Sequence, residues 1–377
     1  MKKKVYATGG NIISPLGCTA AANFRAVAEG RTGVTFHEGT FGIPEPFTAS
    51  LLDRGEVADL AAAEGVEGYN LFETILILSI REAAFRAGVD PADPRTGLVI
   101  SSIKGNVEAL AEDEASVPVS VSAGRVARGL GRSNMPLVVS NACISGLTAL
   151  IHAGRMLQGG SFDRVIVAGA EVQSRFIVSG FQSLKALSPK PCKPFDAARD
   201  GLNLGEAAAT MVLEASESVP EGKWELAEGC TRNDANHISG PSRTGEGSYK
   251  ALRYVLGCCY PEELAFVNVH GTSTLYNDEM ESIALDRAGL SQVPVNALKG
   301  VFGHTMGAAG ILESLISMQA ADAGMVLGTR GFETLGVSRP VNISSENRPT
   351  AKRAFIKLLS GFGGCNAALL FRKGGAL

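Results

Sequence analysis

Strand-like apolar runs alternate with helical patterns along almost the whole of this 377-residue chain. The runs at 96–101, 164–168 and 208–214 have the length and composition of buried strands, whereas 71–87 and 145–158 repeat apolar residues at helical spacing. Further strands are expected at 136–140, 265–269, 294–297, 353–360 and 367–372, and further helices at 20–28, 247–255, 278–288 and 308–320. This alternation predicts an α/β fold with mixed, largely buried sheets.

The composition argues against several classes of protein. With 45% hydrophobic and 19% charged residues, the chain is typical of a globular protein, and its net charge of -3 gives no case for nucleic-acid binding. No apolar run approaches the roughly 18 residues that a membrane-spanning helix needs. The seven cysteines show neither a disulfide framework spacing nor a C-x-x-C pair. Free thiols in a reducing cytoplasm are therefore expected, without a metal site.

Cys143 stands where a strand is expected to turn sharply into a helix. The apolar run 136–140 stops at Asn141, and the helical pattern begins at Ser145. Backbone N–H groups at a helix N-terminus favour negative charge, so they lower the pKa of a nearby thiol and can hold the oxygen of an acyl intermediate. Most free cysteines are small buried hydrophobes, so the rest of the chain has to support the interpretation of Cys143 as a nucleophile.

Two of the five histidines occupy positions typical of catalytic side chains. His270 ends a strand just before Gly271, and His304 lies in a loop between Gly303 and Gly307 that precedes a helix. Strand ends and glycine-rich loops are where α/β proteins place catalytic groups. A cysteine and two histidines at such positions support acyl chemistry through a thioester. Packing or polar-loop positions without a catalytic signal are expected for the other three: His37, His152 and His237.

Two glycine-rich loops precede similar strands in the two parts of the chain. The loop 201–206 leads into the strand expected at 208–214, and the loop 361–366 leads into the strand expected at 367–372. This echo suggests two similar halves, which we place at residues 1–219 and 220–377. The candidate nucleophile then belongs to the first half and both candidate histidines belong to the second.

A series of motif-like stretches spans nearly the whole chain: Tyr6–Gly9 with Ser14–Gly17, Asn141–Gly146, Lys193–Gly201, His270–Thr274, Gly303–Gly310 and Gly361–Gly364. In this order they resemble the motifs of the elongating β-ketoacyl-acyl carrier protein synthases, which use a Cys-His-His triad. The resemblance implies a thiolase-like fold, in which two related halves form a five-layered α-β-α-β-α sandwich with mixed sheets.

The same resemblance implies an acyltransferase, a 3-oxoacyl-acyl carrier protein synthase of fatty-acid or polyketide biosynthesis. Cys143 would hold the acyl group, and the N–H groups of Cys143 and Phe362 would form the oxyanion hole. A malonyl-carrier thioester would then lose carbon dioxide while His270 and His304 hydrogen-bond its thioester oxygen, and the carbanion would attack the acyl group. No cofactor is expected, because the acyl carrier protein brings the phosphopantetheine.

Further site residues are implied by the same resemblance. Lys299 and Glu313 would pair to orient the second histidine and its loop, and Phe362 would act as a mobile gate beside the cysteine. Contacts with the substrate or its phosphopantetheine arm are implied for Thr272, Thr274, Phe181, Leu202 and Gly363.

Two partner proteins are implied, an acyl carrier protein and a second subunit. The second subunit would be an identical chain or a related ketosynthase, and this chain could be active only beside a non-catalytic chain-length partner. An acidic carrier needs a local basic patch. Arg125, Arg128 and Arg132 recur at helical spacing and are candidates for it, with Lys185 and Lys190 as weaker ones.

The chain also departs from the family's usual pattern. The segment between Asn106 and Cys143 is short, and Leu202 stands where an aromatic residue is common. Such departures suit a specialised polyene or polyketide pathway at least as well as fatty-acid elongation. Cys365 beside the C-terminal glycine loop leaves a thiolase as a second enzymatic interpretation, although residues 270–274 fit the decarboxylating branch. Packing under the loop is the simpler role for Cys365.

Overall fold

The computed structural model describes residues 3–375. Up to residue 216 its helices and strands are β1 (Lys4–Ile13), α1 (Ala20–Ala28), β2 (Thr35–His37), β3 (Phe47–Ser50), α2 (Arg54–Ala63), α3 (Leu71–Ala87), β4 (Thr96–Ser101), α4 (Val119–Gly129), β5 (Leu137–Val139), α5 (Ser145–Gln158), β6 (Arg164–Glu171), α6 (Arg175–Ser183), β7 (Leu204–Gly205) and β8 (Ala207–Ser216). After it come β9 (Trp224–Asn233), α7 (Glu246–Val255), β10 (Phe266–Asn268), α8 (Leu275–Arg287), β11 (Pro294–Asn296), α9 (Lys299–Phe302), α10 (Ala309–Asp322), β12 (Met325–Val326), β13 (Asn342–Ile343), β14 (Arg348–Pro349), β15 (Ala354–Gly361) and β16 (Cys365–Lys373).

The strand order repeats in the two parts of the chain. The first part pairs β5-β4-β6-β8-β1 and the second pairs β11-β10-β15-β16-β9, so each has the order third-second-fourth-fifth-first. The directions repeat as well, because the first three strands in each set are parallel and the last two are antiparallel to their neighbours. A short antiparallel ladder between β1 and β9 joins the two sets into one sheet. The boundary proposed at residues 219 and 220 lies in the connection between β8 and β9 and stays a prediction.

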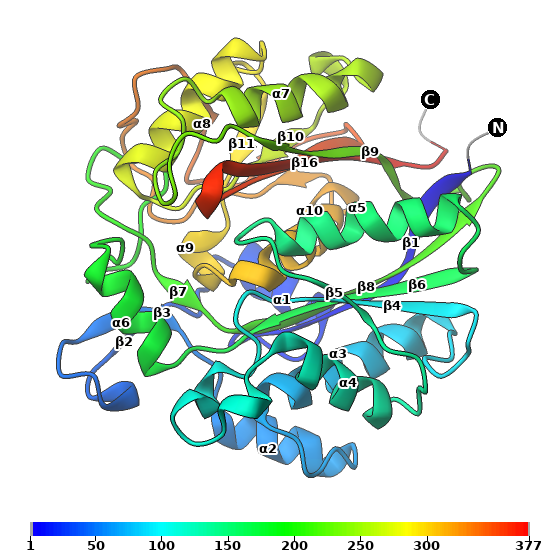
Figure 1. Ribbon diagram of the computed structural model, residues 1–377. Coiled ribbons are helices and arrows are strands. Elements are labelled where there is room, and N and C mark those ends of the chain that lie inside the picture. The colour runs from blue at the N-terminus through cyan, green and yellow to red at the C-terminus, as the bar shows by residue number, and fades with distance from the viewer. Residues whose placement is uncertain (1–2, 376–377) are drawn as a thin grey trace.

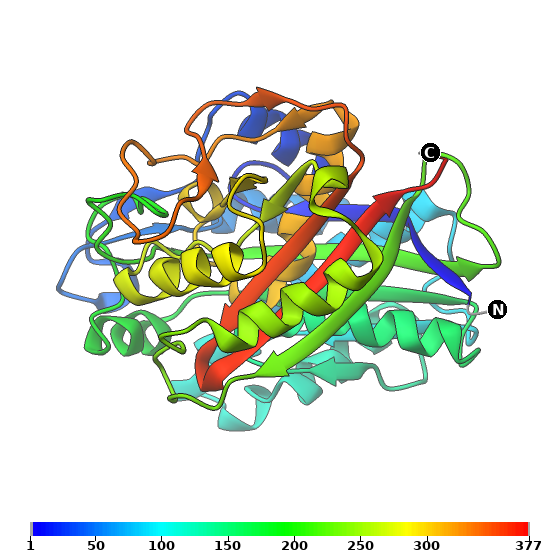
Figure 2. The same ribbon diagram turned by 90° about the horizontal axis from the view of Figure 1, so that it is seen from above.

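The elements are stacked in five layers (Figure 1). Helices α2, α3 and α4 cover the outer face of the first set of strands, and α7 and α8 cover the outer face of the second. Helices α5 and α10 lie between the two sets of strands. Seen from above, the red strands β15 and β16 run obliquely over the green strands of the first set (Figure 2). The mixed α-β-α-β-α sandwich expected from the sequence is therefore confirmed.

Close backbone contact between the two central helices brings the first turns of α5 and α10 together. A Cβ atom on Gly146 would lie 2.7 Å from the carbonyl oxygen of Gly307 and 3.2 Å from the nitrogen of Gly310. A Cβ on Gly310 would in turn clash with the backbone of Leu147. Only glycine fits at such an approach. The two glycines thereby place the loop before α5, which carries Cys143, beside the loop before α10, which carries His304.

Most of the expected elements form where the sequence predicts them. Helices α1, α3 and α5 have the predicted bounds, and α8 begins at Leu275, three residues before the predicted start at 278. Strand β9 and helices α2 and α6 were not predicted. Strand β9 lacks clean alternation because Glu225, Glu228 and Arg232 interrupt its apolar residues. Within residues 3–375, no helix combines the length and the apolar character needed to cross a membrane.

Candidate active site

Cys143 lies in a strained turn between β5 and α5. Its neighbour Ala142 has a φ of 43°, which L residues rarely adopt. The Ser145 hydroxyl holds this turn, because it accepts a hydrogen bond from the Asn141 N–H at 2.7 Å and donates one to the Ala142 carbonyl at 2.6 Å. Helix α5 begins at Ser145 and has no side-chain cap. The turn therefore holds the thiol at the N-terminus of a buried helix.

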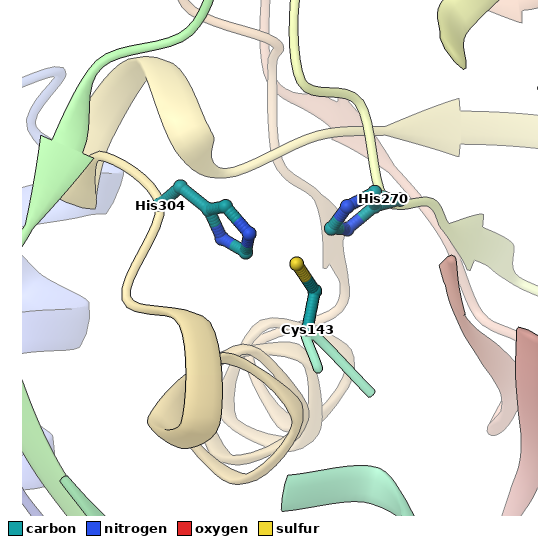
Figure 3. A group of neighbouring side chains, drawn as sticks. All are labelled: Cys143, His270 and His304. Atoms are coloured by element: carbon teal, nitrogen blue, oxygen red, sulfur yellow. The ribbon is translucent and has the colours of Figure 1, made fainter. Parts of the chain in front are cut away.

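The structure brings together Cys143, His270 and His304 (Figure 3). The Cys143 sulfur and one nitrogen of each imidazole all lie within 4.8 Å of one another. The two rings are 5.1 Å apart between centroids and nearly perpendicular, at 82°. All three side chains are buried. His152 is exposed on α5, as its helical phase predicts.

The backbone fixes which nitrogen of His304 faces the thiol. The Met306 N–H donates to His304 Nδ1 at 3.3 Å, so the ring proton of neutral His304 resides on Nε2. Burial, followed by the charges of Lys299 and Lys357, lowers the pKa of His304 well below 6.5. The same causes, with His304 as a further one, lower the pKa of His270. Both imidazoles are therefore neutral at physiological pH, and His304 presents an N–H donor.

The expectation that the helix N-terminus lowers the pKa of Cys143 is wrong for this structure. Burial, with a smaller contribution from neighbouring Cys365, raises the pKa of the thiol to about 12, although Lys299 and the Phe362 N–H act in the opposite direction. Desolvation of the thiolate outweighs the helix terminus here. The resting site thus holds a thiol beside two neutral imidazoles. Because Nε2 of His304 already carries the ring proton, His270 is the imidazole that can accept the proton of the thiol.

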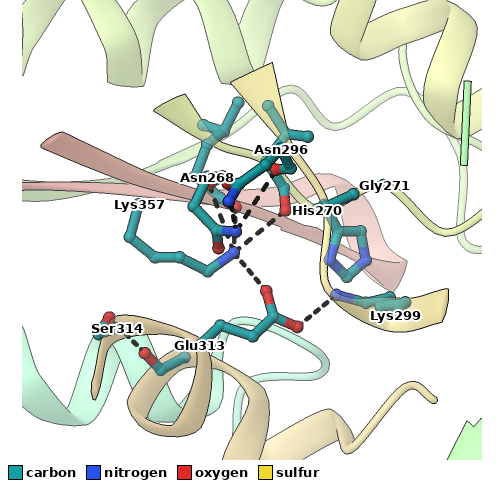
Figure 4. Close-up of polar contacts among 12 residues, drawn as sticks. Asn268, His270, Gly271, Asn296, Lys299, Glu313, Ser314 and Lys357 are labelled. Atoms are coloured by element: carbon teal, nitrogen blue, oxygen red, sulfur yellow. Dashed lines mark hydrogen bonds and ion pairs between the residues drawn. The ribbon is translucent and has the colours of Figure 1, made fainter. Parts of the chain in front are cut away.

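A buried group of two lysines and one glutamate lies behind the histidines (Figure 4). Glu313 on α10 accepts from Lys299 Nζ at 2.9 Å and from Lys357 Nζ at 2.6 Å. All three side chains are at most 2% exposed. Burial alone would raise the pKa of Glu313, but the two ammonium groups lower it below its usual value. The structure therefore brings the predicted pair Lys299 and Glu313 together, and adds Lys357.

A second carboxylate fixes the backbone at His270. Glu281 on α8 accepts hydrogen bonds from the N–H groups of His270 at 2.7 Å and Gly271 at 2.8 Å. Asn277 donates to it at 2.8 Å. Glu281 was not predicted from the sequence, although the buried face of an otherwise polar helix directly after His270–Thr274 was a possible signal.

The triad lies at the base of a cavity of about 430 Å³. Five of the six residues predicted for the gate or the substrate path line this cavity: Phe362, Thr272, Thr274, Phe181 and Leu202. Gly363 is not among the lining residues and instead bonds to the neighbouring loop, since its N–H donates to the Ile238 carbonyl at 2.7 Å. The rings of Phe181 and Phe362 stack at 6.1 Å. Phe362 is 40% exposed, so its side chain has room to move.

One further expectation changes at the cavity, the one for His237, and another is confirmed, the one for Cys365. His237, to which no role was given, lines the cavity, and its Nδ1 accepts hydrogen bonds from the N–H groups of Ser239 and Gly240. Cys365 lies under the glycine loop, where its thiol donates to the Phe362 carbonyl at 3.3 Å.

Three residues of this site have the types and spacing of a metal site. Cys143, His270 and His304 form the one such group among the described residues. However, the ammonium groups of Lys299 and Lys357 lower the pKa values of both histidines by repulsion of positive charge, and the same repulsion disfavours a divalent cation.

Comparison with known proteins identifies this arrangement. The N-terminal domain model of β-ketoacyl synthases matches residues 56–218, and the C-terminal domain model matches residues 225–333. The chain belongs to the β-ketoacyl synthase family. It is similar to 3-oxoacyl-[acyl-carrier-protein] synthase 2 of Vibrio cholerae, with 29% identity over 99% of both chains. It is also similar to the actinorhodin polyketide putative β-ketoacyl synthase 1 of Streptomyces coelicolor, with 26% identity over 99% of this chain and 89% of the relative.

A solved structure shares the fold. A chain in the structure of the ketosynthase ApeO in complex with its chain length factor ApeC, from Xenorhabdus doucetiae, matches with a TM-score of 0.86 and 21% identity, over 99% of this chain and 98% of the other. The alignment with the V. cholerae synthase spans 415 positions, although the present chain has 377 residues. The relative therefore carries residues that this ketosynthase lacks.

The prediction that α4 carries a basic patch for an acidic carrier protein is wrong in part. Arg132 lies beyond the end of α4, is 8% exposed and donates to the Thr96 carbonyl at 2.6 Å. Arg125 pairs with buried Glu73 at 3.0 Å. Both arginines thus support the fold around α3 and α4. Lys185, by contrast, is exposed and lines the cavity.

Proposed function

We propose that this ketosynthase joins an acyl group to two carbons of a malonyl thioester by a ping-pong decarboxylative condensation. One observation supports this most strongly: a thiol and two neutral imidazoles converge at the base of a cavity that opens to solvent. Family membership supports the same reaction. Both substrates would arrive on an acyl carrier protein, whose phosphopantetheine arm supplies the thioester, so the enzyme needs no cofactor of its own.

In the first half-reaction, the Cys143 sulfur attacks the carbonyl carbon of the acyl-carrier thioester. A neutral imidazole accepts the thiol proton, and the departing carrier thiolate takes it up when its C–S bond breaks. The N–H groups of Cys143 and Phe362 would hold the tetrahedral oxyanion. The Phe362 N–H acts to lower the pKa of the Cys143 thiol, and a Cβ on Gly361 would lie 3.1 Å from the Cys143 nitrogen. The glycine loop thereby brings both donors next to the reacting sulfur.

In the second half-reaction, the malonyl carboxyl–carbon bond breaks and its electron pair forms an enolate on the thioester. His304 donates its Nε2–H to the developing enolate oxygen, and His270 donates from the other side. The enolate carbon then attacks the acyl-Cys143 carbonyl, and the bond to sulfur breaks. Carbon dioxide leaves, and the released Cys143 thiolate takes up a proton from solvent, which restores the resting thiol. Decarboxylation supplies the carbanion, so no base has to remove a proton from carbon, and two neutral histidines suffice.

Threonine hydroxyls mark the path of the carrier arm. Thr272 and Thr274 lie in the cavity wall with their hydroxyl oxygens 2.9 Å apart. Such a pair can hydrogen-bond the amide groups of a phosphopantetheine chain. At the mouth of the cavity, Lys185 is a better candidate than Arg125 or Arg132 for contact with an acidic carrier protein.

A second candidate is a ketosynthase that is active only beside a chain-length partner. The likeness to a chain in the complex of the ketosynthase ApeO with its chain length factor supports this alternative. Strand β5 at the edge of the sheet and the segment just before it also expose apolar side chains that a second subunit would cover, with Leu137 44% and Met135 65% exposed. We propose a dimer, identical or mixed, in the cytoplasm, where a catalytic thiol stays reduced.

Product analysis tests the function. The purified chain is incubated with acyl-carrier and malonyl-carrier thioesters of several chain lengths, with and without any subunit that co-purifies. A β-ketoacyl product two carbons longer than the starter is expected from the wild type, and none from Cys143→Ala. Product formation by the Cys143→Ala variant would contradict the proposed function. Product that requires the added subunit would establish the second candidate.

A further inference from the structure

Lys357 is a buried cation that the reaction described above does not use. It lies in the middle of β15, between Ile356 and Leu358, and none of its side chain is exposed. In a strand, residues two apart share a face. Phe355 and Leu359 pack in the core that includes α5 and α10, so Lys357 also points into the central layer. A lone lysine on such a face needs partners, because burying an unpaired charge is costly.

The partners of Lys357 lie around His270. Its ammonium group donates to Glu313 at 2.6 Å, to the Val269 carbonyl at 3.1 Å, to the Leu358 carbonyl at 3.1 Å and to the Asn268 carbonyl at 3.4 Å (Figure 4). Val269 directly precedes His270. Lys357 therefore fixes the carbonyl on one side of His270, while Glu281 fixes the N–H of His270 itself.

Lys357 also sets the charge of the site. Two ammonium groups share one carboxylate, so Lys299, Glu313 and Lys357 together carry one net positive charge in a region without solvent. Burial lowers the pKa of Lys357 to about 8, against the pull of Glu313, so it is largely protonated at neutral pH. Other ionisable groups near the triad are Glu281 and Asp278 on α8, Glu171 at the end of β6 and Cys365 on β16. The same cavity is also lined by Lys185, Asp200, His237 and Tyr276.

We propose that Lys357 is a second positioning cation of this active site, which anchors the backbone at His270 and supplies the positive charge that both imidazoles share with Lys299. Its role in the reaction rests on the proposed function. Both imidazoles have to be neutral in the resting enzyme, because His304 donates through Nε2–H and His270 accepts the thiol proton. A nearby cation disfavours their protonation by solvent before the substrate binds. The same charge stabilises the enolate as negative charge leaves the malonyl carboxylate.

NMR titration of the histidines tests this inference without any substrate. The chain has five histidines, so a protein labelled with ¹³C at the imidazole Cε1 gives few signals, and these are assigned by single substitution. In Lys357→Met, the pKa values of His270 and His304 are expected to rise by about one pH unit, the order of shift that one nearby charge causes. Exposed His152 is the internal reference, and Lys352→Met at an exposed position is the matched control.

A double substitution separates charge from packing. Glu313→Gln in the Lys357→Met background restores one net positive charge through Lys299, so the two histidine pKa values are expected to fall again. Unchanged histidine pKa values in folded Lys357→Met would overturn the proposal. If that variant does not fold, Lys357→Gln, which keeps a donor for the Val269 carbonyl but no charge, is titrated instead and judged by the same result.

Kinetics then connect the charge to the reaction. As the pH is lowered, the rate of malonyl-carrier decarboxylation should begin to fall at a pH about one unit higher in Lys357→Met than in the wild type. At pH values below that point, the rates of the two proteins should differ by up to about tenfold. A uniform loss of kcat with an unmoved pH profile would mean that Lys357 only supports the fold. Absence of decarboxylation in the wild type would contradict the proposed function, while the NMR titration still decides the role of Lys357.

Discussion

Replacement of Glu313 by glutamine should destabilise this protein far more than replacement of either lysine that it binds. Glu313 is the carboxylate partner of both Lys299 and Lys357. In Glu313→Gln, Lys357 keeps its three carbonyl contacts, but Lys299 loses the partner that it contacts at 2.9 Å. Removing one partner of a buried ion pair costs about 3–5 kcal/mol, because the other charge remains buried and unpaired. We expect a loss in that range.

Replacement of either lysine leaves one buried carboxylate paired with one ammonium group. The free energy of unfolding should therefore fall less than in Glu313→Gln. In Lys299→Met the carboxylate still binds Lys357, and in Lys357→Met it still binds Lys299. Loss of one charge-assisted hydrogen bond corresponds to about 1.5–3 kcal/mol. The double variant Glu313→Gln with Lys299→Met should therefore be more stable than Glu313→Gln alone, since it removes the unpaired ammonium group.

Urea unfolding followed by fluorescence measures these differences. Trp224 is the single tryptophan and is 5% exposed, so its emission reports unfolding. Glu45→Gln at an exposed position is the control and should change the free energy of unfolding by less than about 0.5 kcal/mol. The pKa of Glu313 is lowered in the folded protein, so its contribution is complete above its ordinary pKa and is lost as the pH falls through the lowered value. A change of under about 1 kcal/mol in Glu313→Gln at neutral pH would refute the reasoning.

Three further predictions concern the triad. His304→Ala should reduce malonyl decarboxylation on the order of a hundredfold, measured as carbon dioxide release, and reduce Cys143 acylation less; equal losses would count against its role at the enolate. Because the pKa values of His270 and His304 lie well below 6.5, the decarboxylation rate should not fall as the pH is lowered from about 8 to about 6.5, and a half-maximal rate near 6.5 would contradict this. Alkylation of Cys143 by iodoacetamide, followed by peptide mass spectrometry, should rise about tenfold per pH unit between about pH 7 and about pH 10, because burial raises the pKa of this thiol to about 12; a plateau from about pH 8 would show a lower pKa.

Most of the long helices and strands can be predicted from the periodicity of apolar residues in the sequence. Helices α3 and α5 and strands β4 and β15 carry long apolar patterns, so burial alone predicts them. Strand β9 was missed because its charged residues break the pattern, yet pairing with β1 and β16 satisfies its backbone. Tertiary pairing overrides local pattern in such a strand.

The triad could be predicted because its residues occupy conspicuous local settings: a strand-to-helix turn, the end of a strand and a glycine-rich loop. Lys357 and Glu281 could not be assigned in the same way, since their meaning depends on which backbone groups the fold places beside them. A lone lysine among five apolar residues of β15 was nevertheless a visible sign of a buried cation. The pKa of Cys143 was misjudged because the sequence reveals the helix terminus but not the degree of burial.

The most direct test of the account is the mass of the intact protein after incubation with an acyl-carrier thioester, followed by a chase with malonyl-carrier thioester. An acyl adduct that maps to Cys143, and that disappears as a β-ketoacyl product two carbons longer forms, is the predicted result. The Cys143→Ala variant should gain no adduct, while Cys258→Ala, at an exposed thiol, should behave as the wild type. An adduct on another residue, or one that persists through the chase while product forms, would contradict the role of Cys143 as the nucleophile.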